Sequence, residues 1–160
     1  MRLEQREKEL AAIGASIGAN CRPCIKHHIP AGREAGLSEV ELDDAVATAQ
    51  AVRSEAVALL SARIDTLFGH RGAAPEPAPV VRVSKARELV ALGATVGATR
   101  TLCCNSTSGP PPDVGLTSPH VEAAVKMARY VQQHAVDMTA ENANTVLEEL
   151  RRASAGAAGR

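Results

Sequence analysis

Two cysteines and a histidine near the amino terminus form the motif with the clearest chemical potential. Two residues separate Cys21 from Cys24, and His28 follows Cys24 by four residues. Cysteines at this spacing can close a small disulfide ring, and a histidine one helical turn away can donate to a thiolate or transfer a proton. The spacing therefore indicates a redox-active dithiol with a neighbouring proton-transfer group.

Other uses of a Cys-x-x-Cys pair stay open on spacing alone. A structural zinc ion would need two more ligands, and the candidates are His27, His28, Cys103 and Cys104, although no second Cys-x-x-Cys pair occurs. Burial of two free thiols without chemistry is a further alternative. A c-type haem needs histidine directly after the second cysteine, where this chain has Ile25, so that cofactor is excluded.

Composition and charge narrow the class of protein. Apolar residues make up 45% of the 160 residues, which predicts a folded chain, although only 1% are aromatic. Eighteen basic residues balance eighteen acidic ones, so net charge gives no indication of nucleic acid or an anionic membrane as partner. The charged first ten residues lack a signal-peptide core, and no apolar run could span a bilayer. We expect a cytoplasmic protein, where paired cysteines are more often catalytic or metal-binding than structural.

The elements that position the motif have the pattern of helices. Residues from about 2 to 18 and from about 22 to 35 are expected to form a helical hairpin. Asn20 is the candidate N-cap of the second helix, which places Cys21 and Cys24 in or beside its first turn. Unpaired backbone N–H groups and the helix dipole favour a thiolate at such a position.

A third helix is expected after Gly36, which can adopt the positive φ of a helix C-cap. Ser38 and Glu41 have the spacing of a capping box, and apolar residues keep helical spacing as far as Leu67. We allow for a break in this helix near Ser54. No strand-like alternation occurs in the sequence, so we expect an all-α fold.

The sequence repeats itself at an offset of 79 residues. When residues 9–53 are aligned without gaps on residues 88–132, 14 of the 45 pairs are identical. Most other pairs in the first helix are conservative replacements. We interpret the pattern as a duplication of one helical unit.

The duplication predicts four parts, namely a first repeat at 1–70, a Pro-rich linker at 71–82, a second repeat at 83–153 and a flexible tail at 154–160. Within the second repeat we expect helices at about 84–98, 118–134 and 139–153. The segment of the second repeat that corresponds to the helix expected at about 22–35 contains a glycine and three consecutive prolines, which interrupt a helix.

The second repeat has lost most of the chemistry. Arg100 and Thr107 replace the first cysteine and the histidine of the motif, while Cys103 keeps the place of the second cysteine. Cys104 adds a neighbouring thiol. We treat this repeat as a structural partner and leave open a redox role for either cysteine.

The pattern Cys-x-x-Cys-x-x-x-His at residues 21–28, with Glu9 twelve residues before the first cysteine, resembles the carboxymuconolactone decarboxylase and AhpD-like alkylhydroperoxidase family. The similar segment covers about residues 5 to 55. The resemblance implies an all-α fold of two tandem AhpD-like repeats packed as one unit, with the second repeat degenerate. It also implies reduction of hydroperoxides or exchange of disulfides.

Four residues receive roles from this resemblance. Cys24 would attack the peroxide or disulfide, and Cys21 would resolve the sulfenate by forming a Cys21–Cys24 disulfide. Glu9 and His28 would form a proton relay, together with water. Without the resemblance, Glu9 would be interpreted as one more solvated charge on a highly charged helix.

Two details of the expected site are in tension. The helix dipole favours Cys21 as the more acidic thiol, whereas the resemblance assigns the attacking role to Cys24, and we follow the resemblance. Some relatives have a histidine between the cysteines. Here that position is Pro23, so the relay is shorter or uses His27, which we otherwise expect to face solvent.

The expected partners follow from the same resemblance. They are a hydroperoxide or disulfide substrate, a protein or lipoyl-type dithiol as electron donor, and further copies of the chain, most simply in a homotrimer. We expect no cofactor, no bound metal and no nucleic-acid or membrane partner. Two other functions stay open: a decarboxylase-like lyase acting on a small acid, and a non-catalytic oligomeric scaffold.

Overall fold

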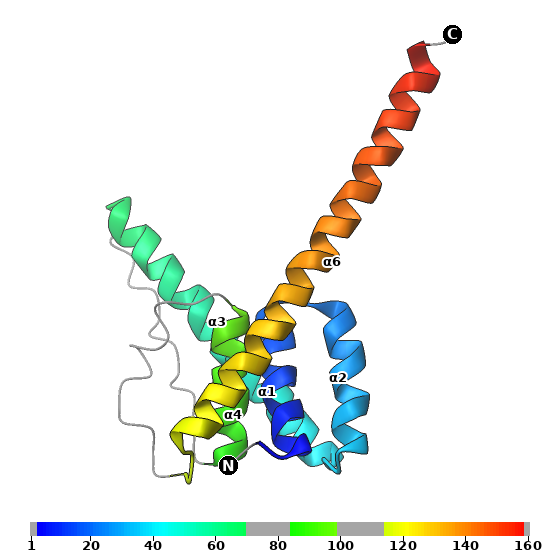
Figure 1. Cartoon of the computed structure of the whole chain (residues 1–160). Coiled ribbons are helices and arrows are strands. Elements are labelled where there is room, and N and C mark those ends of the chain that lie inside the picture. Colours follow the sequence, from blue (N-terminus) through cyan, green and yellow to red (C-terminus); the bar gives the residue numbers. More distant parts are fainter. Residues whose placement is uncertain (1–2, 70–83, 99–113, 159–160) are drawn as a thin grey trace.

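The computed structural model describes residues 3–69, 84–98 and 114–158, and within these ranges its regular structure is entirely helical, as the all-α prediction requires (Figure 1). The helices are α1 (Gln5–Gly18), α2 (Arg22–Glu34), α3 (Glu39–Leu67), α4 (Lys85–Gly97) and α6 (Ser118–Ala158). The predicted linker at 71–82, the interrupted counterpart of the motif helix, and the two cysteines Cys103 and Cys104 lie outside the described residues.

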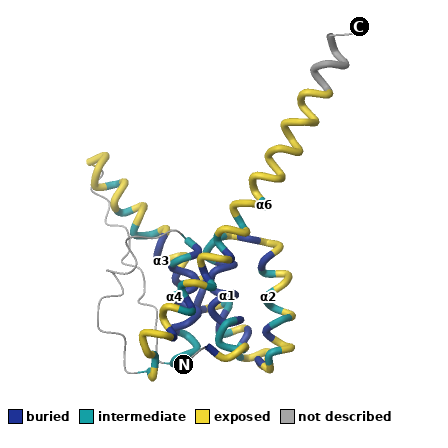
Figure 2. Tube along the Cα trace, viewed as in Figure 1, coloured by how far each residue is buried: buried dark blue, intermediate teal, exposed yellow. Residues whose placement is uncertain are grey.

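Helix α1 forms the centre of the fold and is buried from Glu9 to Ile17 (Figure 2). It packs most closely on α4, its counterpart in the predicted repeat, through glycines. A Cβ added to Gly14 would lie 2.1 Å from the carbonyl oxygen of Val90, and a Cβ added to Gly93 would lie 2.0 Å from that of Ala11. Because both pairs match at the offset of 79, the contact is reciprocal between the two aligned segments.

When the sequence is aligned on itself at the offset of 79, helices α3 and α6 bury residues at equivalent positions. The buried apolar residues common to both are Ala45, Ala49 and Val52 on α3 and Ala124, Ala128 and Val131 on α6. Each of the six has a relative exposure of 2% or less. Small side chains at these positions allow the two helices to approach the α1–α4 pair closely.

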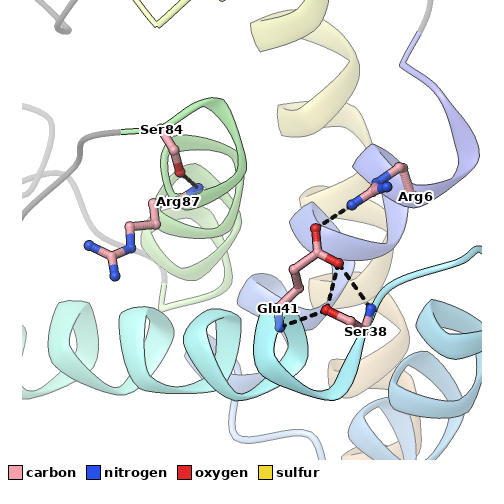
Figure 3. Close-up of polar contacts among 5 residues, drawn as sticks. All are labelled: Arg6, Ser38, Glu41, Ser84 and Arg87. Carbon is pink, nitrogen blue, oxygen red and sulfur yellow. Dashed lines mark hydrogen bonds and ion pairs between the residues drawn. The ribbon is translucent and has the colours of Figure 1, made fainter.

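Local sequence sets where the helices begin (Figure 3). The predicted capping box of α3 is confirmed: Ser38 N–H donates to Glu41 Oε2 at 2.9 Å, and Glu41 N–H donates to Ser38 Oγ at 3.3 Å. Arg6 of α1 also pairs with Glu41 and ties the two helices together. At α4, Ser84 Oγ accepts the backbone N–H of Arg87 at 3.2 Å.

Two helices are longer than the sequence indicated. Helix α3 continues through Ser54 without the break that we allowed for, and α6 is one helix where we predicted separate helices at 118–134 and 139–153. Helix α6 also continues through residues 154–158, where we predicted a flexible tail. Neither glycine nor proline occurs in α3 or between Pro119 and Gly156 in α6, and alanine-rich sequence favours helix.

The carboxyl-terminal halves of α3 and α6 extend beyond the core as two arms, which Figure 2 shows as largely exposed. The large exposed apolar residues of these arms are Val57, Leu60, Ile64, Leu67 and Phe68 on α3 and Val136, Val146, Leu147 and Leu150 on α6. In the part of the chain that the structure describes, no helix combines the length and apolarity needed to cross a bilayer.

Candidate active site

The turn between α1 and α2 places the first cysteine at the start of α2. Asn20 adopts a left-handed conformation (φ 54°) that closes this turn. Cys21, and not Asn20 as we predicted, is the N-cap of α2, because its sulfur accepts the backbone N–H of Cys24 at 3.3 Å. Pro23 fits in this first turn because the turn needs no N–H donor from it. The sequence thus positions both cysteines through the geometry of a helix N-terminus.

The two cysteines are joined in a disulfide, with their Cα atoms 5.2 Å apart. Both are buried, with relative exposures of 5% for Cys21 and 3% for Cys24. The apolar side chains that pack with them come from α1 and α6, namely Ala12, Ala15, Ala128 and Val131. The dithiol therefore lies between the helix preceding it and a helix more than 90 residues later in the chain.

His28, on the same helix α2 as Cys24, forms a hydrogen-bonded pair with Glu9 of α1. His28 Nδ1 lies 2.9 Å from Glu9 Oε2, and the two side chains are only 12% and 8% exposed. Gln5 Nε2 donates to the other carboxylate oxygen, Glu9 Oε1, at 2.8 Å. Glu9, twelve residues before the first cysteine, thus contacts the histidine of the motif, and both of its carboxylate oxygens have hydrogen-bond partners.

A cavity of about 240 Å³ lies beside Cys24 and His28. Its lining residues are Pro23, Cys24, His27 and His28 of α2 with Tyr130, Val131 and His134 of α6. Of the two disulfide-bonded cysteines, only Cys24 lines the cavity. A small molecule that enters it therefore comes next to Cys24.

The α6 residues of the cavity are absent from the sequence prediction. Tyr130 and His134 lie four residues apart and share one helix face, which the sequence could have shown. Nothing in their spacing connects them with Cys24. His27 is exposed, as predicted, but it also lines the cavity and its ring meets that of His28 edge-on at 4.9 Å between centroids.

One further buried histidine has a local explanation. His120 is 2% exposed, and its Nδ1 accepts the backbone N–H of Thr117 at 3.2 Å at the start of α6. Thr117 and His120 align with Ser38 and Glu41 of the first repeat. The histidine thus takes the place that Glu41 has in the capping box, and it belongs to the helix start.

Within residues 3–69, 84–98 and 114–152, no three or more His, Cys, Asp or Glu side chains are arranged to hold a metal ion. The zinc ligands considered from the sequence included Cys103 and Cys104, which lie outside the described residues.

Comparison with protein families gives one match. Residues 2–64 match the profile of the Carboxymuconolactone decarboxylase family. No curated protein and no solved structure matched the chain. The matched segment holds α1, α2 and most of α3, and with them the residues Glu9, Cys21, Cys24 and His28. Residues 2–64 of the chain are therefore similar to the Carboxymuconolactone decarboxylase family.

Proposed function

We propose that the chain is a thiol-dependent oxidoreductase that reduces hydroperoxides or exchanges disulfides through Cys21 and Cys24. One observation carries this proposal: Cys24 is bonded to Cys21 and also lines a cavity that a small substrate can enter. The dithiol is therefore both able to cycle between two redox states and reachable by a reactant.

The oxidative half of the reaction consumes one hydroperoxide. The Cys24 thiolate attacks the terminal oxygen, an S–O bond forms, the O–O bond breaks, and the departing alkoxide takes up a proton to leave as an alcohol. The Cys21 thiol then attacks the sulfenic acid on Cys24, so that a disulfide forms and water leaves. Two electrons pass from the dithiol to the peroxide.

The reductive half needs an external dithiol, which we propose is carried by a protein or a lipoyl-type group. Its thiolate attacks the sulfur of Cys24, the cysteine that lines the cavity, and expels Cys21 as a thiolate. The Cys24 N–H and the positive end of α2 stabilise that thiolate at the N-cap position. The second donor thiol then releases the reduced site as the donor closes its own disulfide.

His28 and Glu9 are suited to move the proton of Cys24. When Nδ1 of His28 carries the hydrogen that Glu9 accepts, Nε2 is an acceptor and can remove a thiol proton. The carboxylate stabilises the imidazolium that results. This arrangement uses a carboxylate and a histidine as orienting group and base.

The test is hydroperoxide consumption with dithiothreitol as reductant. The wild-type chain is expected to turn over, Cys24→Ser to be inactive, and Cys103→Ser to keep the wild-type rate. After oxidation, mass spectrometry of peptides should find a Cys21–Cys24 link. Equal rates for wild type and Cys24→Ser would refute the proposal.

A second candidate is lyase chemistry on a small organic acid, as the name of the family suggests. The three imidazoles that line the cavity could face a carboxylate, which is the observation that favours it. This chemistry does not need a dithiol. Turnover of a small lactone acid that survives in Cys24→Ser would therefore select it, whereas a chain inactive in both assays would point to a scaffold.

We also propose that the chain works as a homo-oligomer, most simply a trimer, in the cytoplasm. The apolar stripes of the two arms support self-association, because contiguous exposed apolar surface of this kind is rare on a monomer. The balanced charge of the chain does not oppose it.

A further inference from the structure

The cavity over Cys24 has walls from two repeats, and each contributes imidazoles. His27 and His28 lie on α2, whereas His134 lies on α6. The second repeat has lost the first cysteine and the histidine of the motif, yet its last helix completes the surroundings of the first repeat's thiol. The α6 side chains of the cavity are therefore candidates for roles in the chemistry.

The three histidines differ in their contacts. His28 is held by Glu9 through Nδ1, and His27 packs edge-on against the ring of His28. His134 forms no hydrogen bond, ion pair or ring contact with any residue in the described ranges, and it is exposed. Its two ring nitrogens are thus available to a molecule in the cavity and to solvent.

The reaction needs a base that removes the proton of the Cys24 thiol and an acid that gives a proton to the departing oxygen. His28, oriented by Glu9 with an accepting Nε2, acts as the base; in this scheme it passes the thiol proton to solvent before the O–O bond breaks and so has none to give to the departing oxygen. The alkoxide that leaves a hydroperoxide is strongly basic, so its departure is slow unless a proton is supplied.

We propose that His134 is the proton donor to the leaving alkoxide, acting from the α6 wall of the cavity. This inference rests on the proposed peroxidase function and deepens it. As the Cys24 thiolate forms its S–O bond and the O–O bond breaks, the His134 imidazolium gives its proton to the alkoxide, which leaves as an alcohol. Neutral His134 regains a proton from solvent, while His28 releases to solvent the proton taken from Cys24.

Two substrates separate a proton donor from a residue that merely shapes the cavity. Cumene hydroperoxide expels a strongly basic alkoxide, whereas peracetic acid expels a weakly basic carboxylate that needs no proton. For His134→Gln we expect kcat/KM to fall about 100-fold with cumene hydroperoxide and to stay within about 3-fold of wild type with peracetic acid.

His27→Gln and Tyr130→Phe are the matched controls, because they alter other proton-bearing groups of the same cavity. Both are expected to keep the wild-type ratio of the two substrates. The inference would be overturned if His134→Gln lost the same fraction of kcat/KM on both substrates, or lost none. A selective loss with cumene hydroperoxide in either control instead would also overturn it.

The same assay distinguishes this inference from the function on which it rests. If wild type consumes neither substrate, or Cys24→Ser matches wild type, the oxidoreductase proposal fails and the role of His134 fails with it. If Cys24 is essential and His134→Gln still behaves as wild type, only the role of His134 is refuted. Far-UV circular dichroism and the Cys21–Cys24 peptide link show whether the variant retains its fold.

Discussion

His28 Nδ1 lies 2.9 Å from Glu9 Oε2, and this contact links the motif helix α2 to the central helix α1. The two residues are 19 positions apart in the chain, and both side chains are largely buried. A buried carboxylate that accepts from one imidazole nitrogen fixes the ring orientation and leaves the other nitrogen free for chemistry. The contact therefore fixes the histidine of the motif through the packing of α2 on α1.

Replacing Glu9 by glutamine should lower activity with little change in shape. The amide of Glu9→Gln can still contact His28, but it cannot stabilise an imidazolium, so kcat/KM for hydroperoxide should fall about 10- to 100-fold. The matched control is Glu88→Gln, at the equivalent buried position of α4. Steady-state kinetics of the two variants should differ by at least tenfold, and similar losses in both would assign Glu9 a structural role only.

The glycine contacts between α1 and α4 should tolerate no side chain. A Cβ at Gly14 or Gly93 would meet backbone atoms at 2.1 or 2.0 Å, and backbone cannot move aside as a side chain can. Although alanine favours helix, we predict that Gly14→Ala lowers the free energy of unfolding by about 3 kcal/mol, measured by urea denaturation.

Gly36→Ala separates this steric effect from backbone strain. Gly36 has φ 87° but no atom within 4 Å of its would-be Cβ, so its replacement should cost about 1 kcal/mol. Equal destabilisation of Gly14→Ala and Gly36→Ala would show that close helix packing is not what Gly14 provides.

The ion pair between α3 and α4 should make stability depend on pH in acid. Arg87 donates to both oxygens of Asp44 at 2.5 to 3.1 Å, and these hydrogen bonds hold the pKa of Asp44 below its usual range, against the effect of burial. A lowered pKa in the folded state contributes stability above the unfolded pKa, and this stability is lost as pH falls through the folded pKa. The effect is modest because the Asp44 side chain is 38% exposed.

Asp44→Asn should therefore lower the urea midpoint at pH 7 and converge with wild type as the pH falls through the lowered pKa of Asp44. Asp43→Asn is the control, since it removes the same charge from the next, exposed position. An Asp44→Asn effect that stays constant as the pH falls from 7 through that lowered pKa would contradict the ion-pair origin.

The apolar arms should hold the oligomer together. Leu67 and Phe68, at the end of α3, are 71% and 74% exposed in the single chain. Introducing charge there with Leu67→Glu and Phe68→Glu should convert a trimer into a species with the 16.7 kDa mass of one chain. Light scattering after size-exclusion chromatography measures this directly.

Val40→Glu is the control for added charge, because Val40 is 78% exposed at the opposite end of α3. This variant should retain the wild-type mass. A wild-type chain that is monomeric at micromolar concentration would refute the trimer itself.

Local sequence signals predicted the helices well where each helix carries its own start and stop residues. The capping box of Ser38 and Glu41 and the positive φ of Gly36 could be predicted because capping depends on residues a few positions apart. The expected break near Ser54 was wrong, because a gap in apolar periodicity marks the exit of a helix from the core as readily as its end. The N-cap at Asn20 was wrong because a cysteine sulfur took that role.

By itself, the sequence determined the residue types of the motif and its position at a helix N-terminus, and it predicted a duplication. The motif and its place in the helix depend on residue type and on spacing within one segment of the chain. The predicted duplication depends only on the alignment of two segments. Only the tertiary structure decided that α1 and α4 meet through glycines and that Tyr130 and His134 line the cavity over Cys24. More than 100 residues separate Cys24 from these α6 side chains, and their meeting depends on how α2 and α6 pack on α1, which no local spacing records.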